Sequence, residues 1–175
     1  PRMVLQKDKT ILLLNTLDEK SILLKKMGLD YLIIHPFSKE FSRLTALDFV
    51  RDILVNTLNT SRLIIGYDHH FGKNREGNIH QLKEYSSLYD FNIQEIPAQD
   101  IDDVSVSSTK IRTALKEGNL KIANNYLGYQ YMLSGIVVRG KQLGGTIGFP
   151  TANIEVEESY KLVPSSGVYV IRTRI

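Results

Sequence analysis

The sequence lacks cysteine, long apolar runs and any block of charge of one sign. Without cysteine the chain can form neither a disulfide framework nor a thiolate metal site. No apolar run approaches the roughly 18 residues that a membrane-spanning helix needs, and no signal-peptide pattern is present. We therefore expect a cytoplasmic protein with no membrane partner.

The charges of the chain nearly balance. The sequence has 22 Lys and Arg against 19 Asp and Glu, a net charge of +3 and a pI near 9.0. The basic residues are interspersed with acidic ones, whereas a nucleic-acid groove requires a basic stripe. This mild positive charge favours binding of anionic small molecules, and we expect no nucleic-acid partner.

The composition predicts a folded protein of one or two domains. The 175 residues are 42% hydrophobic and 23% charged, which supports a globular core. Before residue 129, apolar strand-like runs alternate with helical patterns, which is typical of an α/β domain with a parallel sheet. The expected strands are Tyr31–His35, Arg62–Ile65 and Phe91–Ile96. The expected helices begin near residues 16, 45, 79, 108 and 119. Thr16 and Glu19 read as a capping box for the first helix, which stops at Gly28 in the left-handed C′ position. The second helix carries an apolar face of Leu47, Val50, Leu54 and Leu58, the third runs from about Ile79 to Tyr89, and the last ends at Gly128.

The pattern changes after residue 128. Tyr131–Arg139 and Gly167–Arg174 are strand-like, with glycine turns between them and no helical period. We place a domain boundary here, which gives domains at 1–128 and 129–175. The second region is too short for an independent core on the usual size argument, so we interpret it as the opening strands of a β-barrel.

The most informative stretch is Gly144–Asn153, with the sequence Gly-Gly-Thr-Ile-Gly-Phe-Pro-Thr-Ala-Asn. Its glycines permit close backbone approach, and its backbone N–H groups suit phosphate. In extended chain Thr151 and Asn153 point to the same side, where their oxygens suit Mg²⁺. From the residues alone, a β-hairpin whose turn needs glycine explains the stretch equally well.

A second candidate is the loop from Gly66 to Gly72, which directly follows a predicted strand. Ligands bind beyond the carboxyl ends of parallel strands, so Asp68 and Phe71 are candidates for ligand contact. The adjacent pair His69-His70 is a poor metal site because neighbouring side chains diverge. A solvated turn bounded by two glycines remains an alternative.

A third candidate is the run of hydroxyl residues that opens the helix expected at 108. Ser107, Ser108 and Thr109 offer N-caps at the positive end of the helix dipole, with Arg112 one turn in. This combination can hold a di- or triphosphate. On the residues alone an ordinary N-cap with Arg112 in solvent is favoured. The preceding acidic residues 100, 102 and 103 are interpreted as a solvated loop rather than a Mg²⁺ site.

These motifs together resemble the bacterial bifunctional riboflavin kinase/FAD synthetase family. Pro150-Thr151-Ala152-Asn153 is similar to the riboflavin kinase signature, and Ser107–Arg112 is similar to the Ser-Ser-Thr-x-x-Arg motif of adenylyltransferases. The resemblance covers essentially the whole chain in the right order. Two positions depart from the family pattern: Gly145 replaces a basic residue, and His69 replaces a phenylalanine.

The resemblance implies a Rossmann-like nucleotidylyltransferase domain with a parallel sheet, followed by the start of a riboflavin kinase β-barrel. It implies ATP-dependent phosphorylation of riboflavin to FMN, then adenylylation of FMN to FAD with release of pyrophosphate, both with Mg²⁺. The implied catalytic residues are Ser108, Thr109 and Arg112. The implied ligand contacts are Asp68, Phe71, Ser107, Gly144, Gly148 and Pro150, and the implied metal ligands are Thr151 and Asn153.

The resemblance also implies that the chain is a fragment. The His-x-Gly-His motif of the superfamily is expected upstream of residue 1 and the kinase carboxylate downstream of residue 175, so the fragment itself is expected to be inactive. Two alternatives stay open: a non-catalytic flavin- or nucleotide-binding module, and a nucleotidylyltransferase acting on another phosphorylated small molecule. The sequence does not indicate an oligomeric state.

Overall fold

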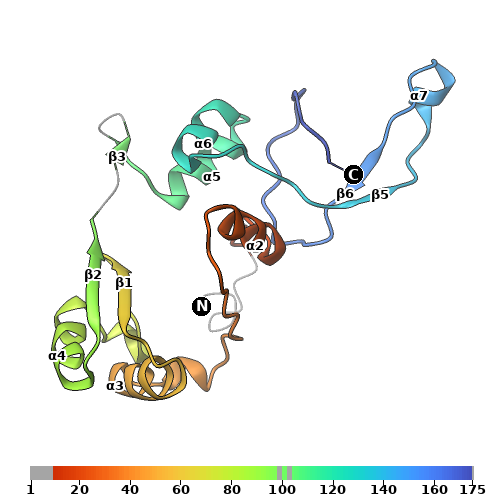
Figure 1. The fold of residues 1–175 in the computed structure, drawn as a ribbon. Coiled ribbons are helices and arrows are strands. Elements are labelled where there is room, and N and C mark those ends of the chain that lie inside the picture. The colour runs from red at the N-terminus through yellow and green to blue at the C-terminus, as the bar shows by residue number, and fades with distance from the viewer. Residues whose placement is uncertain (1–9, 98–99, 102–103, 175) are drawn as a thin grey trace. The chain divides into compact units, whose positions relative to one another are not determined.

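The structure is a computed structural model that describes residues 10–97, 100–101 and 104–174. The described chain forms two compact units, and the first comprises residues 34–105. The second comprises residues 10–33 and 106–174, so the chain leaves the second unit and returns to it. Figure 1 labels most of the helices and strands, and each unit is described by itself.

The first unit contains a parallel pair of strands, as the sequence predicts. Strand β1 (Arg62–Gly66) pairs with β2 (Asn92–Ile96) in register from Arg62↔Asn92 to Gly66↔Ile96, and helix α4 (Ile79–Tyr89) connects them. The predicted bounds of α4 are confirmed. The other elements of this unit are η1 (Phe41–Arg43), α3 (Ala46–Asp48), η2 (Phe49–Thr57), η3 (Lys73–Arg75), β3 (Asp100–Ile101) and β4 (Val104–Ser105).

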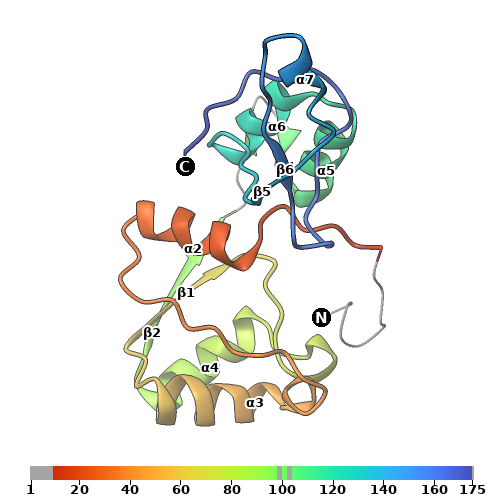
Figure 2. The same cartoon turned by 90° about the vertical axis from the view of Figure 1, so that its right-hand side faces the viewer.

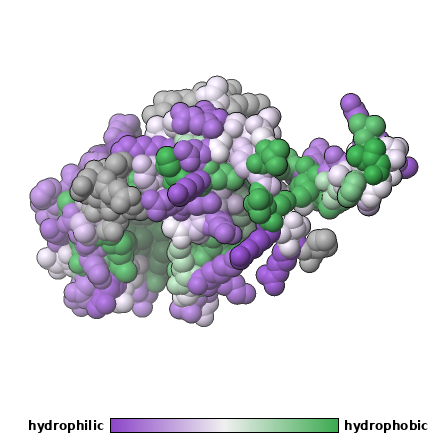
Figure 3. All heavy atoms as spheres, turned by 90° about the horizontal axis from the view of Figure 1, so that it is seen from above, coloured by the Kyte–Doolittle hydropathy of each residue, from purple (hydrophilic) through white to green (hydrophobic). Residues whose placement is uncertain are grey.

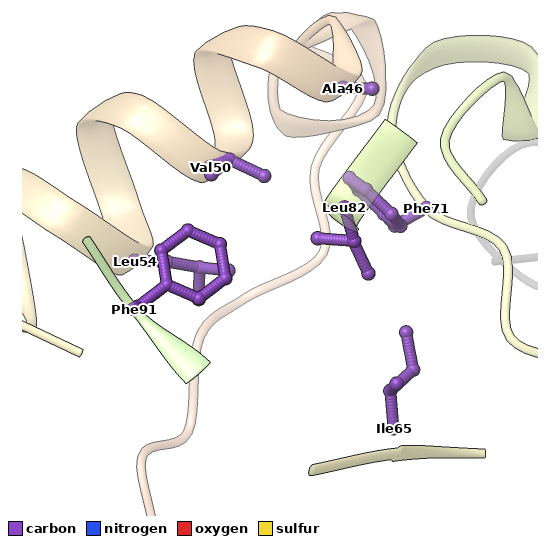
Figure 4. Packing of buried hydrophobic residues seen from close by; sticks show 7 residues of the cluster. All are labelled: Ala46, Val50, Leu54, Ile65, Phe71, Leu82 and Phe91. Atoms are coloured by element: carbon purple, nitrogen blue, oxygen red, sulfur yellow. The ribbon is translucent and has the colours of Figure 1, made fainter. Parts of the chain in front are cut away.

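The core of the first unit lies between the helices and the β1–β2 sheet. Figure 2 shows α4 and the helix formed by α3 and η2 on the same side of the sheet. Figure 4 shows the side chains that meet there. The buried residues of this cluster are Ala46, Val50, Leu54, Ile65, Phe71, Leu82 and Phe91.

One predicted helix face is only partly buried. Val50 and Leu54 are buried as predicted, whereas Leu47 and Leu58 are 37% and 41% exposed. The prediction assumed the α-helical period, but residues 49–57 form a π-helix. A π-helix has a wider turn, so the angular spacing of later positions changes and Leu58 rotates away from the core.

The predicted strand Tyr31–His35 is wrong. These residues form no strand, and Tyr31 and Ile33 are 88% and 66% exposed. A strand needs a neighbouring backbone to pair its N–H and C=O groups, and an apolar run alone does not supply one. The β1–β2 sheet therefore contains two strands in the described part of the chain.

The second unit contains helix α2, a packed pair of helices and a short antiparallel ribbon. Its elements are α2 (Leu17–Lys26), α5 (Ser108–Lys116), α6 (Leu120–Leu127), β5 (Ile136–Val138), α7 (Leu143–Thr146) and β6 (Asn153–Glu155). The predicted capping box of Thr16 and Glu19 is present at the start of α2. Asn119 caps α6, which ends at Gly128 with a φ of 72° in the left-handed region that favours glycine.

The core of the second unit includes a residue from the end of the chain. Helices α5 and α6 lie side by side (Figure 1), and Leu162 packs between their apolar faces with 1% exposure. The other buried members of this cluster are Ile111, Ala114, Leu115 and Ala123. Residues before and after position 128 thus share one core, and the division of activities at that position stays a prediction.

The predicted β-rich region contains one antiparallel ribbon. Strands β5 and β6 pair with Ile136 opposite Glu155 and Val138 opposite Asn153. The strand predicted over Gly167–Arg174 is wrong: Val168 and Val170 are fully exposed and unpaired with any named strand. As with Tyr31–His35, the residue types suit a strand but no neighbouring backbone is in place.

The β5–β6 ribbon ends in the segment that contains α7 (Figure 1), and Figure 3 shows apolar side chains gathered at that end. The exposed fractions there are 67% for Leu143, 72% for Ile147 and 74% for Phe149. This tip belongs to the Gly144–Asn153 stretch singled out in the sequence.

Candidate functional site

The hydroxyl residues Ser107, Ser108 and Thr109 lie at the N-terminus of helix α5, as predicted. Ser107 is the N-cap, and its Oγ accepts a hydrogen bond from the backbone N–H of Lys110 at 3.3 Å. Ser108 and Thr109 are exposed in the first turn of the helix. The positive end of the helix dipole lies at this turn, which favours a bound anion.

Arg112 is oriented by the main chain. Its Nε donates to the carbonyl of Leu12 at 2.8 Å, and the residue is partly buried. The ordinary N-cap of the alternative interpretation is present, but Arg112 is anchored to the main chain and is not fully exposed to solvent. A guanidinium carries five N–H donors in a fixed fork, and this bond uses one of them. The anchored fork lies one turn along the helix from Ser108, on the same face.

The loop after β1 exposes Asp68 but buries Phe71. The Phe71 ring is 9% exposed, and its centroid lies 5.7 Å from that of Phe49 and 6.3 Å from that of His69. A Cβ on Gly77 would lie 2.7 Å from the Phe71 ring, so the glycine allows the loop to close over it. The sequence did not predict this core position, and a flavin contact of Phe71 stays a prediction.

A small apolar pocket lies beside the Phe71 ring. Its volume is about 200 Å³, which is enough for a few heavy atoms of a ring but not for a whole flavin. Its lining includes Gly66, the last residue of β1, and the polar side chain of His69. Its lining residues are Phe49, Leu54, Leu63, Ile64, Ile65, Gly66, His69, Phe71 and Leu82.

The Gly144–Asn153 stretch is a short helix followed by an extended segment. The N–H of Phe149 donates to the carbonyl of Gly144 at 2.7 Å, which closes the turn. A Cβ on Gly144 would collide with the Phe149 carbonyl oxygen, so this close approach requires glycine. Gly148 has a φ of 82°, and Pro150 is exposed just after it.

The two predicted metal residues each lie against a glycine: Thr151 against Gly144, and Asn153 against Gly140 just before the stretch. A Cβ on Gly144 would lie 3.0 Å from the methyl group of Thr151, and the Asn153 amide leaves no room for a Cβ on Gly140. Both Thr151 and Asn153 are exposed. A hydroxyl and an amide oxygen are neutral ligands of the kind that complete the shell of a Mg²⁺ ion carried by phosphates, so the residues fit that ion.

The structure gives no support for a metal site at the acidic residues 100, 102 and 103 or at the pair His69-His70. Within residues 10–97, 100–101 and 104–174, no cluster of three or more His, Asp or Glu side chains is placed to hold a metal. Asp102 and Asp103 lie outside the described residues.

The sequence reasoning missed a buried ion pair. Lys161 Nζ lies 2.5 Å from Glu19 Oε2, and both side chains are 0% exposed. Glu19 had been interpreted only as a capping residue, and no spacing pattern singled out Lys161. Burial lowers the pKa of Lys161, while its hydrogen bond to Glu19 and the charge of that carboxylate oppose the shift.

The parallel strands β1 and β2 joined through α4, followed by a helical pair and an antiparallel ribbon, make this a mixed α/β protein. The arrangement is consistent with a nucleotidylyltransferase domain followed by the start of a riboflavin kinase domain. The family model for FAD synthetase matches residues 1–110, and the model for riboflavin kinase matches residues 127–175. The chain belongs to the FAD synthetase family. We call these matches the synthetase region and the kinase region.

The curated relatives are named for two activities, riboflavin kinase and FMN adenylyltransferase. The chain is 38% identical over 167 residues to a bifunctional riboflavin kinase/FMN adenylyltransferase of Listeria monocytogenes, covering 95% of this chain and 52% of that protein. It is 38% identical over 164 residues to the Escherichia coli K12 protein of the same name, covering 94% of this chain and 52% of that protein. The chain thus spans about half the length of these relatives.

A solved structure has the same fold. A Streptococcus pneumoniae protein described as a macrolide-efflux protein superposes with a TM-score of 0.80 at 32% identity, covering 92% of this chain and 51% of that one. In the described part of the present chain, no helix has the length and apolar character needed to cross a membrane.

Proposed function

We propose that the protein makes FMN and FAD from riboflavin. ATP phosphorylates riboflavin to FMN, and a second ATP adenylylates FMN to FAD with release of pyrophosphate. The observation that carries this proposal is the succession of a synthetase region and a kinase region in one chain. An anchored Arg112 and a glycine-lined Thr151–Asn153 segment give each region residues suited to its phosphate chemistry.

In adenylyl transfer, an oxygen of the FMN phosphate attacks the α-phosphorus of ATP. The bond from that phosphorus to the bridging oxygen breaks, and negative charge grows on the leaving pyrophosphate. Ser108, Thr109 and the N-terminal turn of α5 would donate hydrogen bonds to it, and the Arg112 fork would neutralise its charge. A phosphate nucleophile is already anionic, so these residues position and stabilise without acting as bases.

In riboflavin phosphorylation, the 5′-hydroxyl oxygen of riboflavin attacks the γ-phosphorus of ATP. The bond from that phosphorus to its bridging oxygen breaks, ADP leaves, and the hydroxyl proton is released. Thr151 and Asn153 would hold Mg²⁺, which neutralises charge on the phosphates when bound. The Gly144–Gly148 segment and Pro150 would lie over the phosphates, since its glycines let the backbone come close. The exposed Phe149 ring beside it would shield the site from water.

The remaining candidates lie on the flavin and adenosine side of the synthetase region. Asp68, exposed after β1, would orient the ribityl chain or ATP, and Ser107 would fix the start of α5 against the nucleotide. The pocket beside Phe71 would accept the edge of a ring. The partners proposed are ATP, riboflavin and FMN in the cytoplasm, with neither nucleic acid nor a membrane involved.

The test uses the natural polypeptide that carries this chain, incubated with riboflavin, ATP and Mg²⁺. Chromatography separates riboflavin, FMN and FAD over time. FMN that forms first and FAD that follows would support the proposal. A folded protein that binds flavin but forms neither product would overturn it and favour a binding module. Omission of Mg²⁺ should stop FMN formation.

A further inference from the structure

A buried ion pair joins the synthetase region to the kinase region. Glu19 lies in α2, within residues 1–110, and Lys161 lies within residues 127–175. The two residues are 142 positions apart in the chain, and neither side chain is exposed to solvent. Both belong to the second compact unit, so the contact lies inside a single folded body.

Every donor of the Lys161 ammonium has an acceptor. Besides Glu19, Nζ donates to the carbonyl of Leu14 at 2.6 Å and to that of Met132 at 2.9 Å. It also lies 4.3 Å from the centroid of the Tyr131 ring, a cation–π distance. An ammonium has three N–H donors, so this group is fully satisfied in one geometry.

The Glu19 carboxylate is satisfied as well. Oε2 accepts from the N–H of Thr16 at 3.0 Å, and Oε1 accepts from the N–H of Ser134 at 2.9 Å. A pair held this completely fixes the positions of the backbone segments that supply the bonds, and it tolerates loss of either partner poorly.

One of those segments also orients Arg112. The residues Leu12–Leu14 form a short strap with contacts on both sides. On one side Arg112 Nε donates to the carbonyl of Leu12 at 2.8 Å. On the other side the N–H of Leu13 donates to the backbone carbonyl of Tyr160 at 2.7 Å, and the N–H of Leu162 donates to the backbone carbonyl of Leu13 at 2.9 Å.

We propose that Glu19 and Lys161 are positioning residues for adenylyl transfer. Lys161 holds the Leu14 end of the strap and Glu19 fixes Lys161, so the Leu12 carbonyl stays where it orients the Arg112 fork. A lysine of the kinase region therefore supports the chemistry of the synthetase region. The inference rests on the proposed role of Arg112 at the leaving pyrophosphate.

The test compares Lys161→Met with the wild type in the natural polypeptide. The methionine keeps the apolar stem and removes the ammonium. We expect kcat for FMN adenylylation to fall about fivefold or more, because small displacements of a catalytic group cost large factors in rate. We expect KM for ATP and the rate of riboflavin phosphorylation to change by less than about twofold, since bound substrates and the other site keep their contacts.

A double-mutant cycle separates positioning from a merely structural effect. If Lys161 acts through Arg112, then Lys161→Met should have less than about a twofold effect in an Arg112→Ala background. Equal losses of kcat in both backgrounds, or parallel loss of both activities, would overturn the inference. Glu19→Gln, which keeps the side-chain size, should show the same selectivity if Lys161→Met does not fold.

A surface pair provides the matched control. Arg51 contacts Asp48 and Asp52, but its side chain is 42% exposed and lies in the first unit. Arg51→Met should leave both activities unchanged. A wild-type protein that forms no FAD would refute the proposed function itself, whereas an active wild type with an unselective Lys161→Met variant would refute only the positioning role.

Discussion

The loss of the Glu19 charge should destabilise the second unit strongly and in a pH-dependent way. Glu19→Gln leaves the Lys161 ammonium buried without its counter-ion, although the carbonyls of Leu14 and Met132 still accept from it. Breaking a buried pair typically costs about 3–5 kcal/mol. Because two of the three acceptors remain, we expect about 3 kcal/mol at pH 7, at the lower end of that range.

The pH dependence follows from the lysine. Burial already lowers the pKa of Lys161, and removal of Glu19 removes the two effects that oppose this shift. The folded state then binds fewer protons than the unfolded state between the lowered pKa and the usual lysine value of about 10.4, so stability rises with pH in that window. The free energy of unfolding of Glu19→Gln should therefore approach that of the wild type as the pH rises from 7 toward about 10, so the stability deficit of the variant shrinks.

Urea denaturation followed by circular dichroism at pH 7 and pH 9.5 measures this deficit. Arg51→Met, which breaks a solvent-exposed pair, should leave the free energy of unfolding nearly unchanged and show no such pH trend. A Glu19→Gln deficit below about 1 kcal/mol at pH 7, or one that grows with pH, would refute the reasoning from burial.

Three further predictions concern single side chains. Arg112→Ala should lower FAD formation from FMN at least about tenfold, or about 1.4 kcal/mol in barrier, and spare FMN formation; equal losses in steady-state assays of both steps would count against separate sites. Thr151→Ala should show the reverse selectivity, and unchanged FMN formation across a Mg²⁺ titration would remove Thr151 from the metal site. Phe71→Ala should destabilise the first unit by about 3–5 kcal/mol because the ring is 9% exposed in the core; a thermal melt that matches the wild type would show that the ring is not packed there.

Local signals in the sequence predicted local structure well. The capping box of Thr16 and Glu19 is present, Gly28 adopts the predicted left-handed conformation with a φ of 86°, and the last helix ends at Gly128 as predicted. The bounds of Ile79–Tyr89 are also as predicted. These features depend on residues within one or two helical turns, so the sequence window contains all the interacting groups.

Features that depend on distant backbone were not predictable in the same way. Tyr31–His35 and Gly167–Arg174 have strand-like residues but no paired neighbour, and the sequence pattern cannot supply one. The burial of Phe71 depends on the loop that returns at Gly77 to cover its ring. A window around Phe71 shows an aromatic residue in a glycine-bounded loop and nothing of the helix it packs against.

In the candidate site, too, the local features were predicted from the sequence and the long-range contacts were not. The motif residues Ser107 to Arg112 were identified from their order in the chain, and their helix begins where the hydroxyl run predicts. The bond that orients Arg112 comes from Leu12, 100 positions away, and the pair of Glu19 and Lys161 spans an even longer separation. The residue types in the motif indicated the chemistry, whereas the distant contacts that hold those residues in place became visible only in the folded structure.

The most direct test of the central claim is the time course of riboflavin, FMN and FAD in the natural polypeptide supplied with riboflavin, ATP and Mg²⁺. The account predicts that FMN accumulates first and is then converted to FAD, with pyrophosphate released in equal amount to the FAD formed. A folded protein that converts neither riboflavin to FMN nor FMN to FAD would contradict it.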